Sequence, residues 1–247
     1  MCRMMAVIPK GRSKLDSAFV RSFRNLAFLG KVPPSSKPGH GDGWGIVTWL
    51  NGVPTYLGRE PTDAFSDTAY ERACDNIDSL HPSTPVIVHL RKASVGLKIK
   101  ENTHPFIIRE WAFAHNGTIR KLNLKSKTDS QWFFEFLMRK YVNGRYMTQI
   151  IAEALSAVKG VYPYTSLTFI LSNGKELYAY RDCTKLENYY EMFFTETKDA
   201  LVICQEKIFE SDWKEMQVGE LLHVKEDSSY EKIELYHPIP LATKLSR

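Results

Sequence analysis

A cysteine stands at position 2, directly after the initiator methionine. If Met1 is removed, Cys2 becomes the first residue and carries both a thiol and a free α-amino group. Such an amino group has a pKa of about 7.7–8.0, so part of it is unprotonated at neutral pH and can accept the thiol proton. This pattern predicts an N-terminal nucleophile, although a cysteine is often only a small buried hydrophobic residue.

An arginine follows an apolar run in the segment 86–96. The run Val86 to Leu90 predicts a strand that delivers Arg91 at its end. A guanidinium presents a planar fork of donors, so Arg91 inside a pocket would hold a substrate carboxylate through two hydrogen bonds. At a surface, the same arginine would form an ordinary ion pair.

A second apolar run, Trp111 to His115, ends in Asn116 and Gly117. The side-chain amide of Asn116 and the backbone N–H of Gly117 could both point at the oxygen of a tetrahedral intermediate, and glycine lets the backbone come close. These two residues therefore predict an oxyanion hole. The alternative interpretation of the same dipeptide, without a catalytic role, is an Asn-Gly turn.

Asp129 opens a predicted helix, with Thr128 beside it as a possible cap. A carboxylate at a helix N-terminus usually caps the helix or interacts with its dipole. If the pocket faces this end of the helix, Asp129 could instead bind the α-ammonium group of an amino-acid substrate.

Two further histidines, His104 and His115, lie in the same part of the sequence. Neither has a carboxylate or cysteine at metal-ligand spacing, so we expect them to be hydrogen-bonded walls of the pocket. No metal or other cofactor is expected.

Strands and hairpins must position these residues. The run 4–8 predicts a buried strand at the start of the chain, and Asn51-Gly52 and Asn173-Gly174 each predict a hairpin between two apolar segments. Further strands are expected at 192–195, 201–204, 221–224 and 233–236.

Helices are expected where apolar residues recur with helical spacing. Three groups of this kind follow the first strand, and a fourth leads to Gly160. Their apolar positions are Leu15, Phe19, Phe23 and Leu26; Phe65, Ala69, Ala73 and Ile77; Trp132, Phe133, Phe136 and Leu137; and Ile150, Ile151, Ala154, Leu155 and Val158.

Runs of strands joined by hairpins, with helices in separate blocks, predict an α+β fold with antiparallel sheets. Two packed sheets covered by helices would account for so many strands. With 247 residues and no linker or low-complexity tract, we expect one domain over 1–247.

The composition is ordinary for a globular protein, with 43% hydrophobic and 25% charged residues. No apolar run is long enough to span a bilayer, and the N-terminus does not resemble a signal peptide, so we expect a cytoplasmic protein without membrane association. The net charge of +5 is scattered along the chain, so nucleic-acid binding is not expected.

Taken in order, these motifs resemble the class II glutamine amidotransferases. This family includes the glutaminase halves of glucosamine phosphate synthase and of phosphoribosylpyrophosphate amidotransferase. The segment 42–46 and the chain length look closest to stand-alone members that act on γ-glutamyl compounds. The motifs that carry the resemblance are Cys2, His89-x-Arg91-x-Ala93-Ser94-x-Gly96, Asn102-x-His104-Pro105, His115-Asn116-Gly117 and Thr128-Asp129-Ser130.

The resemblance implies a four-layer αββα sandwich, the N-terminal-nucleophile (Ntn) hydrolase fold. It implies Cys2 as the nucleophile and Asn116 and Gly117 as the oxyanion hole. Arg91 and Asp129 would bind the substrate's α-carboxylate and α-ammonium groups. We count Ser94, His104 and His115 among the predicted substrate-binding residues.

Three positions depart from the family pattern. Val95 stands where glucosamine phosphate synthase has a histidine, Gln131 replaces a frequent glutamate, and Lys92 occupies a position that is often aromatic. These departures concern the outer contacts of the substrate more than the chemistry.

The predicted activity is hydrolysis of glutamine or another γ-glutamyl amide through a thioester at Cys2, which releases glutamate and ammonia or an amine. Two alternatives remain open. The chain could be a glutaminase subunit that feeds ammonia to a separate synthase, or a non-catalytic protein that binds or senses γ-glutamyl compounds on the same fold.

Overall fold

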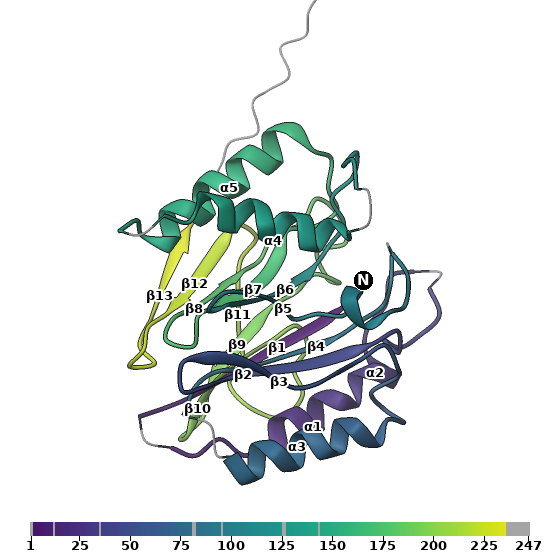
Figure 1. Ribbon diagram of the computed structural model, residues 1–247, viewed down its shortest axis with the longest axis vertical. Coiled ribbons are helices and arrows are strands. Elements are labelled where there is room, and N and C mark those ends of the chain that lie inside the picture. The colour runs from purple at the N-terminus through teal and green to yellow at the C-terminus, as the bar shows by residue number, and fades with distance from the viewer. Residues whose placement is uncertain are drawn as a thin grey trace, which may run out of the picture.

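The computed structural model of the protein describes residues 2–11, 13–34, 36–80, 83–94, 96–124, 127–142 and 144–235. Two antiparallel β-sheets lie face to face between two layers of helices (Figure 1). This arrangement confirms the α+β, four-layer αββα fold predicted from the sequence.

The first sheet has seven strands, and the strand that follows Cys2 lies inside it, between two others. The sheet order is β11 (Lys214–Glu215), β9 (Phe193–Glu196), β10 (Ala200–Cys204), β1 (Arg3–Pro9), β4 (Val86–Leu90), β2 (Trp44–Leu50) and β3 (Val53–Glu60).

The second sheet has six strands. Their order is β13 (Tyr230–Glu234), β12 (Glu220–Val224), β8 (Leu177–Tyr180), β7 (Thr168–Ser172), β6 (Trp111–Asn116) and β5 (Phe106–Ile108).

Strand β1 is buried along its whole length because both of its faces are covered. Successive side chains of a strand point to opposite faces. Met5 and Val7 accordingly join the core beneath the helices, whereas Met4, Ala6 and Ile8 join the core between the two sheets. A strand with two buried faces is apolar throughout, which is why this segment has no alternating pattern.

The helices cover the outer faces of the sheets (Figure 1). Helices α1 (Ala18–Arg24), α2 (Leu26–Leu29) and α3 (Thr68–Leu80) pack against the seven-stranded sheet. Helices α4 (Asp129–Lys140) and α5 (Met147–Val161) cover the six-stranded sheet. A single short 3-10 turn, Lys100–Asn102, precedes β5 among the described residues.

Both predicted hairpins are present, as β2–β3 and β7–β8. Asn51 and Gly52 both have positive φ, as a two-residue hairpin turn of type I′ requires. Gly174 is also held at positive φ, and a Cβ there would lie 2.5 Å from the Trp49 ring, so this turn packs against the first hairpin.

Some element boundaries differ from the prediction. The first expected helix is divided at Asn25 into α1 and α2. Phe65 precedes α3 and stacks on Phe28 at the surface rather than entering the core. The last expected strand begins earlier, at Tyr230, and Tyr236 lies outside the described residues.

The strand register brings the predicted site residues to one edge. Arg3 pairs with Leu90, so the residues just beyond, Cys2 and Arg91, lie at the same end of the seven-stranded sheet. Strand β6 of the other sheet ends at Asn116, which hydrogen-bonds to Cys2.

In the described part of the chain, no helix combines the length and apolarity needed to cross a membrane.

The packing between the sheets predicts that shortening a buried side chain there strongly lowers the stability of the protein. Ile170 is fully buried in this core, so Ile170→Ala should lower the free energy of unfolding by about 2–5 kcal/mol. Val53→Ala, at a side chain that is 61% exposed, should change it by less than about 0.5 kcal/mol. Urea unfolding of the two variants measures both values, and equal losses would contradict the assigned core.

Candidate active site

Cys2 lies at the start of β1, with its side chain almost fully buried. The Sγ atom is 3.8 Å from the carbonyl oxygen of Lys92, a long contact of the kind sulfur makes. The backbone nitrogen of Cys2 donates to Oδ1 of Asn116 at 2.9 Å, so the predicted nucleophile and the predicted oxyanion residue are in direct contact.

The side-chain amide of Asn116 is fully engaged in this structure. Its Nδ2 atom donates to the carbonyl oxygen of Cys2 at 2.9 Å and to Oε1 of Gln205 at 3.1 Å. An amide nitrogen has two N–H groups. Binding of an oxyanion by Asn116 would therefore require one of these bonds to be exchanged or shared.

Gly117 is required by a close approach of two backbones. A Cβ at this position would lie 1.9 Å from the carbonyl oxygen of Ser166 and 2.8 Å from Nε2 of His115. Asn116 belongs to β6 and pairs with Thr168, so the dipeptide continues a strand end and does not form a hairpin turn.

Arg91 is buried, which excludes the alternative of a surface arginine. Its Nη1 donates to the carbonyl oxygen of Leu97 at 2.9 Å, and its backbone nitrogen donates to the carbonyl of Gly43. The guanidinium is thus held against Leu97, in the loop that follows β4.

Asp42 braces the same loop. Its Oδ2 accepts the N–H of Ala93 at 2.9 Å, and Oδ1 forms an ion pair with Lys98. Burial alone would raise the pKa of Asp42, but the Lys98 ammonium, the Ala93 N–H and the charge of Arg91 outweigh it and hold the pKa below its ordinary value.

Ser94 and Asp129 both contact the segment 118–119. The exposed Ser94 hydroxyl is 3.1 Å from that of Thr118. Asp129 is the first residue of α4, and its Oδ2 accepts the N–H of Ile119 at 2.8 Å. Thr128 is the helix cap, so the carboxylate of Asp129 is not the capping group.

His115 lies behind this carboxylate and is buried. Its Nδ1 is 2.9 Å from the Ser130 hydroxyl, and its Nε2 is 3.2 Å from the carbonyl oxygen of Ser166. Burial lowers the pKa of His115, although the negative charge of Asp129 opposes the shift. His115 is therefore a hydrogen-bonded wall that fixes Ser130 at the start of α4.

His104 stacks on His89, with ring centroids 4.3 Å apart, and packs against the tilted ring of Phe106, with centroids 4.2 Å apart. Neither ring nitrogen of His104 has a hydrogen-bond partner within the part of the chain that the structure describes. Burial holds the pKa of both histidines well below the ordinary value; the Arg91 charge adds to the shift of His89, and His89 adds to that of His104. His104 thus packs between His89 and Phe106 and, among the described residues, lacks the hydrogen bond that was expected for it.

Two of the departures from the family pattern have structural roles. Gln131 is the third residue of α4 and forms a reciprocal capping box with Thr128. The Lys92 ammonium donates to the carbonyl oxygens of Lys37 and Gly39 and so fixes the loop that precedes β2. The third departure, Val95, lies outside the described residues, as does Met1.

Four residues around Cys2 were not predicted from the sequence. The buried Arg3 donates to the carbonyl oxygen of Cys2 at 2.9 Å and forms an ion pair with Glu206. The hydroxyl of Tyr189 is 3.5 Å from the same carbonyl, and Gln205 contacts Asn116.

Except for Arg3, which is adjacent to Cys2, these residues are far from Cys2 in the sequence, and no local motif marks them. The only local sign is a charged residue, Arg3, at the start of a run that is otherwise apolar.

Among the described residues, no group of three or more histidine, cysteine, aspartate or glutamate side chains could hold a metal ion. The side chains around Cys2 supply a thiol, amides, a guanidinium and a carboxylate, which are the groups that nucleophilic acyl transfer uses.

The fold, two antiparallel sheets between layers of helices, is that of the Ntn hydrolases, and the comparisons agree. Residues 1–192 match the family described as glutamine amidotransferases class-II, and the chain belongs to this family. It is 34% identical over 159 residues to a Haemophilus influenzae protein whose name assigns it provisionally to the glutamine amidotransferases, covering 57% of this chain and 52% of that protein.

Two solved structures share the Ntn-hydrolase fold with this chain. One is glutamine phosphoribosylpyrophosphate amidotransferase of B. subtilis, with a TM-score of 0.67, 15% identity, and coverage of 96% of this chain and 50% of that one. The other is a glutamine aminotransferase class-II domain protein from Silicibacter pomeroyi, with a TM-score of 0.64, 17% identity, and coverage of 94% and 99%. The matched regions span 52–66% of the curated relatives' lengths.

The buried ion pair between Arg3 and Glu206 predicts that replacing Arg3 strongly lowers the stability of the protein. Arg3→Met leaves the carboxylate of Glu206 without its cation and should lower the free energy of unfolding by about 3–5 kcal/mol, whereas adding Glu206→Gln should recover part of the loss. Lys10→Met, at the exposed pair with Glu196, should cost less than about 1 kcal/mol. Urea unfolding compares the variants, and a loss for Arg3→Met no larger than that for Lys10→Met would contradict this account.

The buried histidines predict a loss of stability in mild acid. His89, His104 and His115 have pKa values below the ordinary 6.5 when folded. The unfolded chain therefore binds more protons below about pH 6.5, and the free energy of unfolding falls as the pH falls through that value. Urea midpoints between pH 7.5 and 5 should show this decline, and His104→Gln should make it shallower. If the urea midpoint of His104→Gln fell with pH as steeply as that of the unchanged protein, His104 would not contribute to the loss of stability in acid.

Proposed function

We propose that this protein hydrolyses γ-glutamyl amides, with Cys2 as an N-terminal nucleophile after removal of Met1. The observation that carries the proposal is the contact of the Cys2 backbone nitrogen with Asn116 Oδ1. After processing, this nitrogen would be the α-amino group. The Asn116 carbonyl would then hold the amine beside the thiol, where it can take the thiol proton.

The reaction would proceed in two steps. The Cys2 sulfur attacks the γ-carbonyl carbon while the α-amino group takes the thiol proton. The C–N bond then breaks, and the amine leaves with that proton. Water next attacks the thioester, which releases glutamate and restores the thiol.

The oxyanion formed in each step needs hydrogen-bond donors. The N–H of Gly117 follows Asn116 directly in the chain, and Asn116 can supply a second donor if its bond to Gln205 is released. Removing one donor of an oxyanion hole typically lowers turnover by about a hundredfold to a thousandfold. Gln205 would thus be the resting partner of the Asn116 amide.

The amino-acid end of the substrate would lie against Arg91 and Asp129, whose charges are opposite and complementary to an α-carboxylate and an α-ammonium. Both side chains are buried, and each is fixed by a backbone group. Such preorganised groups bind a zwitterion with little reorganisation. Ser94, which contacts Thr118, would lie next to the amino-acid end of the substrate.

The other thiols of the chain are poorly suited to nucleophilic attack. Burial raises the pKa of Cys74 and Cys204 to about 12 and that of Cys183 to about 11. Their thiolate forms are therefore rare at neutral pH.

Activity should depend on Cys2 and on its free amine. Cys2→Ala should abolish hydrolysis of glutamine and γ-glutamyl amides, whereas Cys183→Ala, at the half-buried thiol, should retain it. A protein made with a non-cleavable N-terminal extension should also be inactive although its thiol is intact, because its Cys2 has no free amine. Glutamate release measures activity, and mass spectrometry of the active protein should show loss of Met1. Full activity of Cys2→Ala would refute the proposal.

A glutaminase subunit remains the second candidate, because the matched regions span little more than half of some relatives. Strong stimulation of glutaminase activity by a separate ammonia-using protein would favour this role. The non-catalytic alternative would be favoured by binding of γ-glutamyl compounds without turnover and with Met1 retained.

A further inference from the structure

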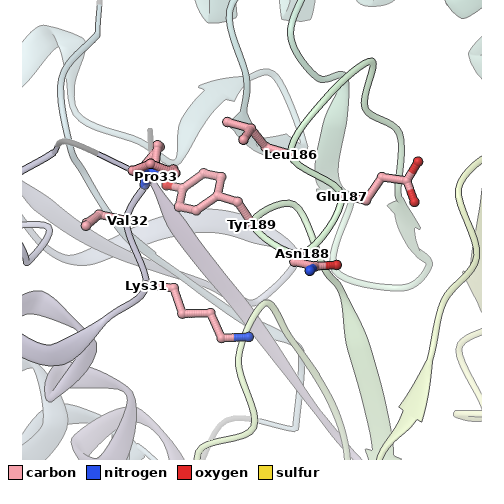
Figure 2. A pocket seen from close by; sticks show the side chains of 8 residues that line it. Lys31, Val32, Pro33, Leu186, Glu187, Asn188 and Tyr189 are labelled. Carbon is pink, nitrogen blue, oxygen red and sulfur yellow. The ribbon is translucent and has the colours of Figure 1, made fainter.

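A pocket of about 610 Å³ is formed by two loops from distant parts of the sequence (Figure 2), and one of its lining residues, Tyr189, contacts the carbonyl oxygen of Cys2. One loop precedes the first hairpin, and the other follows β8. The residues that line the pocket are Lys31, Val32, Pro33, Pro34, Leu186, Glu187, Asn188 and Tyr189.

Both loops are tied to Cys2 through Arg3. The Arg3 guanidinium donates to the carbonyl oxygens of Cys2 and Lys31, at 2.9 and 2.8 Å, and lies over the Tyr189 ring, 4.3 Å from its centroid. The Tyr189 hydroxyl also reaches the Cys2 carbonyl. The pocket wall therefore contacts the main chain of Cys2, through Arg3 and through the Tyr189 hydroxyl.

The pocket is separate from the groups assigned to the amino-acid end of the substrate. Arg91, Ser94 and Asp129 contact the segments 97 and 117–119, and none of them lines the pocket. A substrate held by those groups would present the other side of its scissile bond toward the remaining space around Cys2.

The lining is mainly apolar and rigid. Val32, Pro33, Pro34, Leu186 and Tyr189 contribute carbon surfaces from both loops, and the ring of proline fixes the backbone and removes an N–H donor. In Figure 2 the Glu187 carboxylate points away from the Tyr189 ring. The Lys31 ammonium is paired with Glu191 at 2.7 Å, which balances its charge.

Leu186 supports a binding role for this wall. It keeps 44% of its side chain exposed and has a φ of 59°, a left-handed conformation that is unfavourable for leucine and more easily adopted by asparagine. The fold covers this side chain only in part, so it retains apolar surface that a ligand could cover. Strain of this kind often accompanies ligand sites.

We propose that this pocket receives the leaving amine of a γ-glutamyl conjugate, and that this amine is an apolar amino acid such as leucine or phenylalanine. The inference rests on the proposed hydrolase function and adds the substrate class. Ammonia is about as small as water, which occupies about 30 Å³, so release of ammonia from glutamine needs no pocket of this size. The reaction is the hydrolysis given above, with the amino acid leaving as the protonated amine.

The test compares substrates on the processed protein. The ratio kcat/KM should be about tenfold to a hundredfold higher for γ-glutamyl-leucine and γ-glutamyl-phenylalanine than for glutamine, because burial of an apolar side chain favours the conjugates. γ-Glutamyl-glutamate and γ-glutamyl-lysine should lack this advantage.

A matched pair of variants separates binding from folding. Leu186→Asn should reduce kcat/KM for γ-glutamyl-leucine about tenfold, leave glutamine hydrolysis unchanged, and keep or raise the unfolding temperature because asparagine tolerates the backbone. Leu80→Asn, at a half-exposed leucine at the end of α3, should change neither substrate.

The outcomes distinguish the two proposals. Hydrolysis of glutamine without any preference for apolar conjugates, or equal effects of Leu186→Asn on both substrates, would overturn the pocket assignment and leave the hydrolase function standing. Absence of hydrolysis for glutamine and every conjugate would overturn the proposed function, and the pocket assignment with it.

Discussion

The side-chain amide of Asn116 pairs with the main chain of Cys2 on both sides of that residue. Its oxygen accepts the Cys2 N–H, and its nitrogen donates to the Cys2 carbonyl. The two bonds connect the end of β6 in one sheet to the residue before β1 in the other. Because buried backbone groups without partners are costly, this pairing fixes the chain start in one orientation. The thiol belongs to the residue held in this way, and Gly117 and Arg3 are the next residues along the two paired segments.

Much of the fold was predictable because it follows from local patterns. The Asn-Gly turns specified two hairpins, and apolar runs marked most of the strands. Strands β5 and β11 were missed because they have only three and two residues, too few to show a pattern. The break at Asn25 and the surface position of Phe65 depend on tertiary packing, which a helical spacing of apolar residues does not reveal.

The places of the candidate site residues were predictable where the chain itself brings a residue to the end of a strand or to the start of a helix, as for Asp129. Arg91 and Asn116 directly follow or end apolar runs, so their places could be expected. The contributions of Tyr189, Gln205 and Glu206 depend on β10 pairing with β1, a contact between segments nearly 200 residues apart. Nothing in the residues near Cys2 specifies that pairing, which arises only when the complete sheet forms.

The pairing of β10 with β1, which are nearly 200 residues apart, has a consequence for synthesis of the protein. Cys2 leaves the ribosome well before the tyrosine, glutamine and glutamate that surround it, because these residues follow it by about 200 positions. Contacts between such distant segments form late, since the chain between them must be ordered before they gain anything. A chain not yet made through β10 would therefore carry Cys2 without these contacts, and the surroundings of its thiol would form only after β10 has paired with β1.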